Sequence, residues 1–254
     1  FNGCYPGKVP MVLGHESTGI VEQVGSDVHY VKPGDHVITC LSVFCGHCEQ
    51  CVTGHLSLCG EDEVNRGPEE EPRLSQDGQS LEQFARLGSF AEMMLVHEHA
   101  VVKIREDMPS AQAALIGCGV TTGIGAVIHT AKVEPGATVA VIGCGGIGLS
   151  TINGAAIAGA SRIIAVDMVA SKLELARKFG ATDVVDASDG DAVAKVKELT
   201  GGGVHYSFEA IGLKVCAEQA FQMLRIGGTA TVIGMIPPGD MAVSYTHLTL
   251  PTKR

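Results

Sequence analysis

The strongest constraint on the fold is a regular alternation of strand-like and helix-like segments from Pro135 onward. Five β-branched runs ("ATVAVI", "SRIIAVD", "TDVVD", "VHYSFEA" and "TATVIGM") are separated by helical stretches such as "SKLELARKFG" and "KVCAEQAFQMLRIG". Strands that alternate with helices form a parallel sheet, because each crossover helix returns the chain to the end of the sheet at which the previous strand began. The second half of the chain is therefore predicted to be an α/β domain.

Residues before about 110 have a different rhythm. Short alternating stretches such as "GIVEQVG", "DHVITC" and "FAEMMLVHEHAVVKI" are separated by turn signals such as "KPGD". This pattern predicts a small β-rich domain. Its acidic interruption from Glu61 to Gly88 contains Gly and Pro and is predicted to be a solvated surface loop.

These patterns divide the chain into three segments. We expect a β-rich domain over 1–112, an α/β domain over 113–242 and a non-native tail over 243–254. The tail contains "VSYTHLTLPT", which resembles one translation frame of a sequencing adapter. Because the chain begins with Phe1 in a Gly- and Pro-containing stretch, we also expect natural sequence upstream of it.

Charge and composition exclude several classes of partner. The formal net charge is −10 with few basic runs, whereas nucleic acids and anionic membranes require clustered Lys and Arg. No stretch approaches the length of an apolar membrane span, and the start lacks signal-peptide features. We therefore predict no nucleic acid, no membrane and a cytoplasmic location. Nine cysteines, several of them scattered, favour reduced thiols over a disulfide framework.

The turn after the first strand of the α/β segment carries a phosphate-binding pattern. Gly143, Gly145 and Gly148 have the spacing G-x-G-x-x-G between a strand and a helix, and the next strand ends at Asp167. These glycines permit a tight turn, close approach of a pyrophosphate and close packing of the helix. A carboxylate at Asp167 would bind ribose hydroxyls and repel a 2′-phosphate, which predicts NAD. A glycine-rich turn without a ligand is the alternative.

A second motif packs four cysteines into fifteen positions as C-x2-C-x2-C-x7-C. Its members are Cys45, Cys48, Cys51 and Cys59. Four thiolates on one loop suit a closed tetrahedral Zn2+ site, which is structural because no position remains for a substrate. An iron–sulfur loop would place the fourth cysteine after three residues and before proline, whereas Gly60 follows here. An iron–sulfur cluster, paired disulfides, and replacement of a cysteine by His47 or His55 stay open.

A catalytic metal needs three protein ligands and one open position. Two glycine-bounded segments supply candidates: "LGHESTG" contains His15 and Glu16, and "LIGCGVTTG" contains Cys118. Taken singly, an isolated histidine or buried cysteine is more often a packed residue than a ligand.

Together these motifs resemble the zinc-dependent medium-chain alcohol dehydrogenase family. The "GHE" motif, the "KPGD-x-V" turn, the four-cysteine loop, "GCGVTTG", "GCGGIG" and the strand-end aspartate occur in that family's order and approximate spacing. The resemblance runs from Pro6 to Pro238. It implies an α/β protein with a GroES-like β-rich catalytic domain and a Rossmann doubly wound parallel-sheet domain whose last strand is missing.

The resemblance also implies a role for each candidate residue. His15 and Cys118 would bind a catalytic zinc that Glu16 tunes or transiently joins, and the four loop cysteines would bind a structural zinc. Thr122 would face the nicotinamide as part of the catalytic set, and Ile147 would press on its far side. The implied nucleotide-binding residues are Gly143, Gly145, Gly146, Ile147, Gly148, Asp167, Lys172 and Thr122.

The implied activity is zinc-dependent, NAD-linked oxidation of an alcohol to an aldehyde or ketone, and the reverse. A full-length subunit would hold one catalytic and one structural Zn2+ and would form a homodimer or homotetramer. A formaldehyde–thiol adduct or a polyol is the alternative substrate. A zinc-less quinone reductase, a crystallin or a binding module is the alternative class, but such proteins have no need of His15, Glu16 and Cys118. A fused iron–sulfur electron carrier is the third alternative.

The sequence departs from the family pattern at its start. The family's other catalytic cysteine lies roughly twenty residues upstream of the histidine, whereas Cys4 lies eleven residues before His15 and is not taken as that ligand. The hydroxyl and histidine of the proton relay are also absent. We therefore expect the 254-residue chain by itself to be inactive or nearly so.

Overall fold

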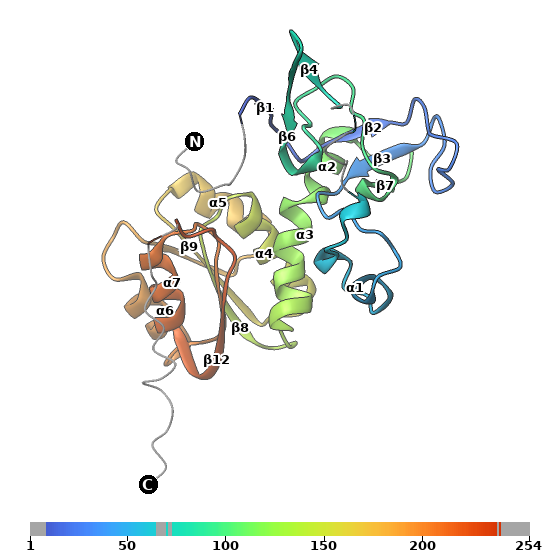
Figure 1. Cartoon of the computed structure of the whole chain (residues 1–254). Helices are drawn as coiled ribbons and strands as arrows, with labels where there is room; N and C mark the ends of the chain where they lie inside the picture. Colours follow the sequence, from blue (N-terminus) through green and yellow to red (C-terminus); the bar gives the residue numbers. More distant parts are fainter. Residues whose placement is uncertain (1–8, 65–69, 71–72, 238, 240–254) are drawn as a thin grey trace. The chain divides into compact units, whose positions relative to one another are not determined.

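The structure is a computed structural model that describes residues 9–64, 70, 73–237 and 239 (Figure 1). The chain divides into two compact units, Phe1–Cys118 (unit 1) and Gly119–Arg254 (unit 2). Cys4 and the predicted tail 243–254 lie outside the described residues. The predicted boundary between 112 and 113, and the separate tail, stay predictions.

Unit 1 is built around a three-stranded antiparallel sheet with the order β2-β3-β7. The strands are β2 (Thr18–Ile20), β3 (His36–Thr39) and β7 (Val101–Lys103). All four residues of the central strand β3 are buried, and a strand pairs with each of its edges.

The other elements of unit 1 are short. Strand β1 (Met11–Val12) pairs with β6 (Glu82–Gln83), and β4 (Ser75–Gln76) forms a hairpin with β5 (Gln79–Ser80). The helices are α1 (Glu49–Val52) and α2 (Ser110–Ala114). The 3-10 turns are η1 (Leu56–Leu58), η2 (Asp62–Val64), η3 (Phe84–Arg86), η4 (Glu98–Ala100) and η5 (Leu115–Gly117).

The prediction of a solvated loop from Glu61 to Gly88 is wrong for part of that segment. Val64 and Leu87 are only 3% and 0% exposed, and they pack with Val43 and Ala100 in one apolar cluster. The acidic composition of the segment gives no indication that these two apolar residues are buried.

Strands in unit 1 are also shorter than the alternating patterns predict. Within residues 90–104 only β7 is a strand, and Met93 and Leu95 upstream of it are 69% and 61% exposed. Alternation of apolar and polar residues favours an extended backbone, but it does not supply the neighbouring strand that ladder pairing requires.

Unit 2 contains the predicted parallel sheet, with five strands in the order β10-β9-β8-β11-β12. Figure 1 labels β8, β9 and β12 of this sheet. The strands are β8 (Thr138–Ile142), β9 (Arg162–Asp167), β10 (Asp183–Asp186), β11 (Val204–Glu209) and β12 (Leu224–Val232). The helices are α3 (Gly119–Gly125), η6 (Ala126–Ala131, of the π type), α4 (Gly146–Ile157), α5 (Ala170–Lys178), α6 (Ala192–Thr200) and α7 (Lys214–Gln222). The chain starts at β8, runs outward to β10 and then returns to β11, so the order reverses between β8 and β11.

The core of unit 2 lies on both faces of this sheet. Val139 and Val141 of β8 belong to one buried apolar cluster, and the alternate residues Ala140 and Ile142 belong to a second. Because helices cover both faces, the central strands are almost entirely apolar, which explains the continuous β-branched runs in the sequence.

One predicted helix in unit 2 is too long. The stretch "KVCAEQAFQMLRIG" is helical only as far as Gln222, and Leu224 pairs with Val204 as the first residue of β12. The positive φ of 78° at Gly227 is incompatible with a right-handed helix. Strand β12 begins at Leu224 because the preceding Met223 is fully buried and Leu224 can pair with Val204 of β11.

Among the described residues, no single helix is long and apolar enough to cross a membrane. One bent pair of helical segments, Ser110–Gly117 with Gly119–Ala131, passes this test of length and composition when the two are taken together. Helix α4 is apolar but shorter.

Candidate metal centres and nucleotide-binding turn

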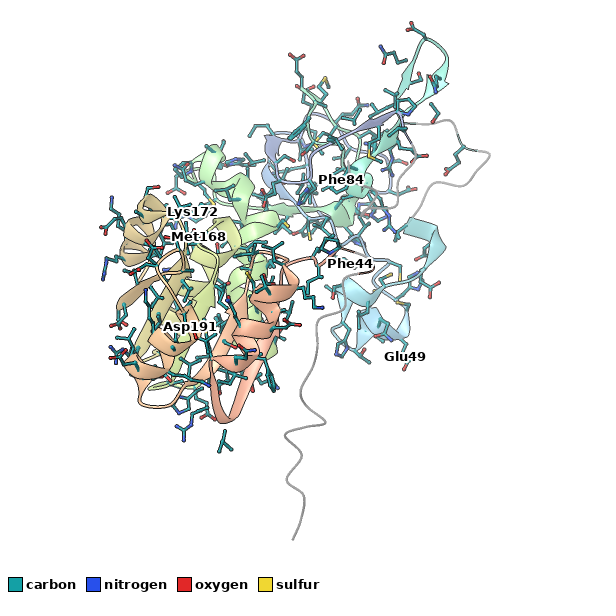
Figure 2. The ribbon with its side chains drawn as sticks, turned by 90° about the vertical axis from the view of Figure 1, so that its left-hand side faces the viewer. Phe44, Glu49, Phe84, Met168, Lys172 and Asp191 are labelled. Carbon is teal, nitrogen blue, oxygen red and sulfur yellow. The ribbon has the colours of Figure 1, made fainter. Side chains whose placement is uncertain are left out.

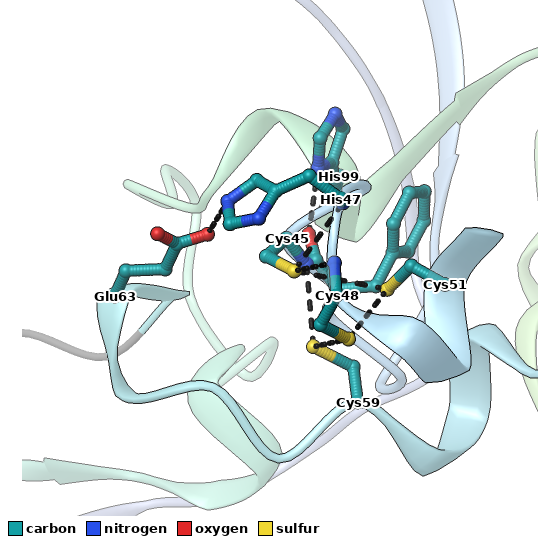
Figure 3. Close-up of polar contacts among 8 residues, drawn as sticks. Cys45, His47, Cys48, Cys51, Cys59, Glu63 and His99 are labelled. Carbon is teal, nitrogen blue, oxygen red and sulfur yellow. Dashed lines mark hydrogen bonds and ion pairs between the residues drawn. The ribbon is translucent and has the colours of Figure 1, made fainter.

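The four cysteines of the predicted loop converge on one point (Figure 3). Their Sγ atoms all lie within 4.8 Å of one another, at 3.8 Å for Cys45–Cys51, 3.5 Å for Cys48–Cys51 and 4.0 Å for Cys48–Cys59. A tetrahedron with metal–sulfur distances of about 2.3 Å has edges of about 3.8 Å. None of the described cysteines forms a disulfide. The sulfur positions therefore fit a single tetrahedral ion.

Local structure produces this convergence. Gly46 has a φ of 93°, which turns the chain directly after Cys45. Cys48 is the N-cap of α1 and Cys51 lies in that helix, so a spacing of three places both sulfurs on the same side. Cys59 ends the 3-10 turn η1 and completes the set.

Backbone N–H groups surround the sulfurs. The Cys45 N–H donates to Cys59 Sγ at 3.3 Å, and the Cys48 N–H donates to Cys45 Sγ at 3.3 Å. Burial raises the pKa of the Cys51 thiol to about 12. Backbone donors at Glu61 and Cys45 lower the pKa of Cys59 to about 7. The loop thus combines a buried thiol with a readily ionised one, and metal binding requires thiolates.

The two loop histidines lie outside the four-sulfur set. His47 Nε2 lies 2.5 Å from Glu63 Oε1, and both side chains are at least half exposed. His55 Nδ1 lies 3.2 Å from Thr53 Oγ1. His47 does lie near Cys45, with Glu63 as a third possible donor within 4.8 Å. Since four sulfurs already converge, a tetrahedral ion there needs neither histidine.

A second ligand cluster contains His15, Glu16 and Cys118. One donor atom of each lies within 4.8 Å of the other two, and all three residues are half-buried. Imidazole, carboxylate and thiolate are donors that suit zinc. Among the described residues no fourth His, Cys, Asp or Glu joins this cluster. A catalytic zinc site takes three protein ligands, and His15, Glu16 and Cys118 are candidates for such a site.

Gly14 fixes the backbone conformation that leads into His15. Its φ is 91°, and an added Cβ would lie 2.6 Å from Phe90 Cδ1 and from Ser89 Oγ. The Phe90 N–H donates to Leu13 O at 2.9 Å, so this contact is part of the backbone pairing. The His15 ring contacts Phe84 edge-on at 5.5 Å between centroids; Figure 2 labels Phe84.

Gly117 determines where Cys118 lies. An added Cβ at Gly117 would lie 2.1 Å from Thr39 O at the end of β3, which is closer than any real contact. Only glycine therefore allows η5 to approach β3 so closely. This approach carries Cys118 to His15 although 102 residues separate them in the sequence.

The glycine turn in unit 2 has the geometry that its spacing predicts. Gly143 has a φ of 94°, and an added Cβ at Gly148 would lie 1.7 Å from Gly143 O. Around Gly145 and Gly146, in contrast, an added Cβ would meet only open space. Gly145 is the N-cap of α4 and supplies no side-chain cap. The first N–H groups of α4 are thus suited to an anion.

The carboxylate of Asp167 ends β9 and is 9% exposed. Its Oδ2 accepts from the Cys144 N–H at 2.8 Å and its Oδ1 accepts from the Val169 N–H at 3.0 Å. A carboxylate has about four acceptor positions, so both oxygens can also accept from ribose hydroxyls. Lys172 Nζ lies 4.0 Å from Asp167 Oδ2; Figure 2 labels Lys172 and Met168, which follows Asp167.

Thr122 and Ile147 lie on two helices that touch. Gly123 of α3 approaches α4 so closely that an added Cβ would lie 2.6 Å from Ile147 O. Thr122 precedes that contact and is half-buried, as is Ile147. The predicted nicotinamide-facing residues therefore belong to adjoining parts of unit 2, and their contact with a nucleotide stays a prediction.

Glu209, which no sequence motif singled out, ends β11 next to the point where the strand order reverses. It is fully buried; its Oε1 accepts from the N–H groups of Ile211 at 2.8 Å and Gly212 at 2.6 Å. Its Oε2 is buried with no hydrogen-bond partner. Burial and this carboxylate raise the pKa of the Cys216 thiol. The available signal was an acidic residue inside the otherwise buried strand "VHYSFEA".

The fold and these sites define a class of protein. A parallel-sheet unit with a phosphate-type glycine turn, combined with a β-rich unit that has two zinc-type ligand sets, is typical of metal-dependent dehydrogenases that bind a nucleotide.

Comparison with known proteins specifies the class further. Residues 1–106 match the alcohol dehydrogenase GroES-like domain, and residues 146–254 match the zinc-binding dehydrogenase domain. "Alcohol dehydrogenase class-3" of Myxine glutinosa is 41% identical over 98% of this chain and 68% of its own length. "Probable S-(hydroxymethyl)glutathione dehydrogenase 1" of Schizosaccharomyces pombe is 43% identical over 92% of this chain and 63% of its own length. The crystal structure of benzyl alcohol dehydrogenase from Acinetobacter calcoaceticus has a TM-score of 0.85 at 36% identity, covering 96% of this chain and 67% of that one.

The chain belongs to the zinc-dependent medium-chain alcohol dehydrogenase family. This finding confirms the resemblance and the predicted combination of a GroES-like and a Rossmann fold. Membership implies Zn2+ and NAD as cofactors and oxidoreductase chemistry for the family. The chain spans less than two thirds of the length of the first relatives that it matches.

Proposed function

We propose that the whole protein oxidises an alcohol to an aldehyde or ketone, and catalyses the reverse reaction, in a zinc-dependent and NAD-linked manner. The observation that carries this proposal is the convergence of His15, Glu16 and Cys118 in unit 1. A zinc-less reductase or binding module would have no need of such a ligand set. The glycine turn and Asp167 in unit 2 add a nucleotide site.

The chain's own residues would divide the work between two metals and one nucleotide. His15 and Cys118 would hold a catalytic ion with Glu16 as the adjacent carboxylate, and the four loop cysteines would hold a structural ion. When bound, zinc supplies a Lewis acid and NAD supplies a hydride acceptor. The half-buried positions of the three ligands would limit access of water to the ion.

The nucleotide would be held at the carboxyl ends of the strands of the parallel sheet. The open space at Gly145 and Gly146 would admit the pyrophosphate to the uncapped N-terminus of α4. Asp167 would accept hydrogen bonds from the adenosine ribose and repel a 2′-phosphate, with Lys172 close by. Thr122 and Ile147 would contact the nicotinamide from two sides.

A formaldehyde–thiol adduct is the second candidate substrate, because of the names of three relatives. Those from Schizosaccharomyces pombe, Saccharomyces cerevisiae and Synechocystis are all called S-(hydroxymethyl)glutathione dehydrogenase, at 41–43% identity. The benzyl alcohol dehydrogenase of Acinetobacter calcoaceticus supports a simple alcohol instead.

The test is NADH formation by the full-length protein with benzyl alcohol and with S-(hydroxymethyl)glutathione. We expect turnover with NAD that exceeds turnover with NADP, and loss of turnover in Cys118→Ala. The kcat/KM ratio of the two substrates decides between the two candidates. Turnover that persists undiminished in Cys118→Ala and after zinc removal would overturn the proposal.

Two further predictions concern the whole protein, and a third concerns the 254-residue chain. We propose that the whole protein forms a homodimer or homotetramer, which light scattering would measure. We propose that it is cytoplasmic, which cell fractionation would measure. We also propose that the 254-residue chain alone has little or no turnover. Turnover restored to that chain by zinc and NAD alone would contradict the last prediction.

A further inference from the structure

Residue His99 ties the start of the four-cysteine loop to a distant part of unit 1 (Figure 3). Its Nδ1 lies 2.7 Å from Phe44 O, across 55 positions of sequence. Its ring also stacks on the Phe44 ring, with centroids 4.4 Å apart and planes 3° apart. A carbonyl oxygen only accepts, so Nδ1 carries a hydrogen and donates it.

The carbonyl that accepts this bond belongs to the peptide that leads into Cys45. A peptide unit is planar, so Phe44 C=O and Cys45 N–H point in opposite directions and rotate together. The Cys45 N–H donates to Cys59 Sγ at 3.3 Å. One peptide therefore receives a hydrogen bond from His99 and gives one to a sulfur of the metal site.

The backbone around His99 is itself held in place by hydrogen bonds. The His99 N–H donates to His97 Nδ1 at 3.1 Å within the 3-10 turn η4. The next residue, Ala100, is 1% exposed, and its carbonyl accepts from the Cys40 N–H at 2.8 Å. An added Cβ at Gly46 would lie 3.7 Å from His99 Cε1, so the imidazole also contacts the turn after Cys45.

We propose that His99 is a positioning residue for the four-cysteine metal site, because it sets the orientation of the Phe44–Cys45 peptide and thereby aims an N–H at Cys59 Sγ. The inference rests on the proposed role of the four cysteines as metal ligands. It goes beyond that role by assigning a function to a histidine that ligates no metal.

The physical consequence concerns how firmly the site retains its metal. Without His99 the Phe44 carbonyl loses its donor and the peptide is free to rotate. The Cys59 sulfur then accepts a weaker hydrogen bond from the Cys45 N–H and keeps its other backbone donor, at Glu61. Loss of a direct hydrogen-bond partner of a metal ligand costs roughly 10- to 100-fold in metal affinity, and the lower end applies to His99 because it acts through the Phe44–Cys45 peptide.

The test compares two substitutions of nearly equal shape in the zinc-loaded 254-residue chain. His99→Asn keeps an N–H donor near the position of Nδ1, whereas His99→Leu removes it. All proteins carry Cys118→Ala, which removes the other candidate metal centre. The readout is the rate of zinc release to a chromogenic chelator, and circular dichroism checks folding. His55→Ala is the matched control, because His55 lies in the same loop and bonds to Thr53 rather than to a sulfur's peptide.

We expect zinc release to be faster by roughly 10-fold in His99→Leu, with His99→Asn and His55→Ala close to the parent. In a cobalt-substituted sample, the thiolate-to-metal absorption band should shift in His99→Leu but not in His99→Asn. His99→Phe, which keeps a stacking ring without a donor, replaces His99→Leu if the latter does not fold.

Two results would overturn the inference, and they are distinguishable. If the donor-free variants release zinc at the rate of the parent, or at the same rate as His99→Asn, His99 does not act through its hydrogen bond. If the Cys118→Ala parent retains no metal at all, the four cysteines are not a metal site and the inference fails with that assignment.

Discussion

The two metal-ligand sets of unit 1 differ in how the chain assembles them. The four cysteines come from fifteen consecutive residues, and one turn, one short helix and one 3-10 turn bring their sulfurs together. His15, Glu16 and Cys118 come from opposite ends of the unit and meet only because Gly14 packs on Phe90 and Gly117 packs on Thr39.

This difference predicts different sensitivities. The loop site should depend on its own sulfurs and on the metal, since a bound ion replaces the missing apolar core of a short loop. The three-ligand site should depend on backbone contacts far from its ligands. Substitutions at each place test whether the two sites are separable.

The largest effect is expected from Cys48→Ala. Three sulfurs cannot close a tetrahedral site, so the chain should lose its tightly held zinc, and unit 1 should lose at least about 3 kcal/mol of unfolding free energy. Metal analysis and urea unfolding measure both quantities. Cys40→Ala, which removes a cysteine outside both clusters, should retain the metal. Equal metal content in the two variants would show that the loop binds no ion.

A substitution in unit 2 should have the next largest effect and leave both metal sets intact. Gly148→Ala places a methyl group 1.7 Å from Gly143 O, and overpacking against backbone costs about 3 kcal/mol. We expect weaker NAD binding by calorimetry as well, because the turn must open. Gly146→Ala is the control for stability alone, because the added methyl group meets open space and the protein's unfolding free energy should be unchanged. Equal stability of the two variants would refute the close approach at Gly148.

A smaller effect is expected from Gly117→Ala, which perturbs only the three-ligand site. Its methyl would lie 2.1 Å from Thr39 O, so η5 must move, at a cost of about 2 kcal/mol. The second zinc equivalent should bind more weakly while the loop keeps its own. Gly125→Ala, in a helix with open space around it, should not destabilise the protein. Loss of loop zinc in Gly117→Ala would mean that the two sites are coupled.

The smallest effect is expected from Asp183→Asn in unit 2. The Arg162 guanidinium donates to both Asp183 oxygens, at 2.9 and 2.8 Å, and lowers the pKa of that carboxyl to about 2. A depressed pKa contributes stability that is present above the ordinary value of about 3.9 and is lost as pH falls through about 2.

Because the pair is partly exposed, Asp183→Asn should cost about 1 kcal/mol at neutral pH, after allowance for screening by solvent. The difference from the parent should shrink between about pH 4 and pH 2 in urea titrations. Zinc content should not change. A difference that is independent of pH would show that the ion pair is not its source.

The same contrast between local and distant contacts explains how much the sequence could predict. The parallel sheet of unit 2 was predictable because the central strands β8 and β9 contain continuous apolar runs and the turn between β8 and α4 is rich in glycine. The four-cysteine loop was predictable because its spacing is local. The end of α7 was not, because pairing of Leu224 with Val204 outweighs the helical pattern.

Contacts between distant segments left no readable pattern in the sequence. The approach of Gly117 to Thr39 and of His99 to Phe44 depends on how the strands of unit 1 pair, which the short alternating stretches do not specify. The grouping of His15, Glu16 and Cys118 was anticipated from the family resemblance rather than from spacing. Val64 and Leu87 were missed because acidic neighbours dominate their segment.

The most direct test of separable metal sites is a zinc titration of the 254-residue chain, with chelator competition, in the parent, Cys48→Ala and Cys118→Ala. We predict that the parent binds one zinc ion tightly and a second one more weakly. Cys48→Ala should lose the tightly bound ion. Cys118→Ala should lose only the weakly bound ion and keep unit 1 folded. A single binding event, or loss of the tightly held equivalent in Cys118→Ala, would contradict the assignment of two independent centres.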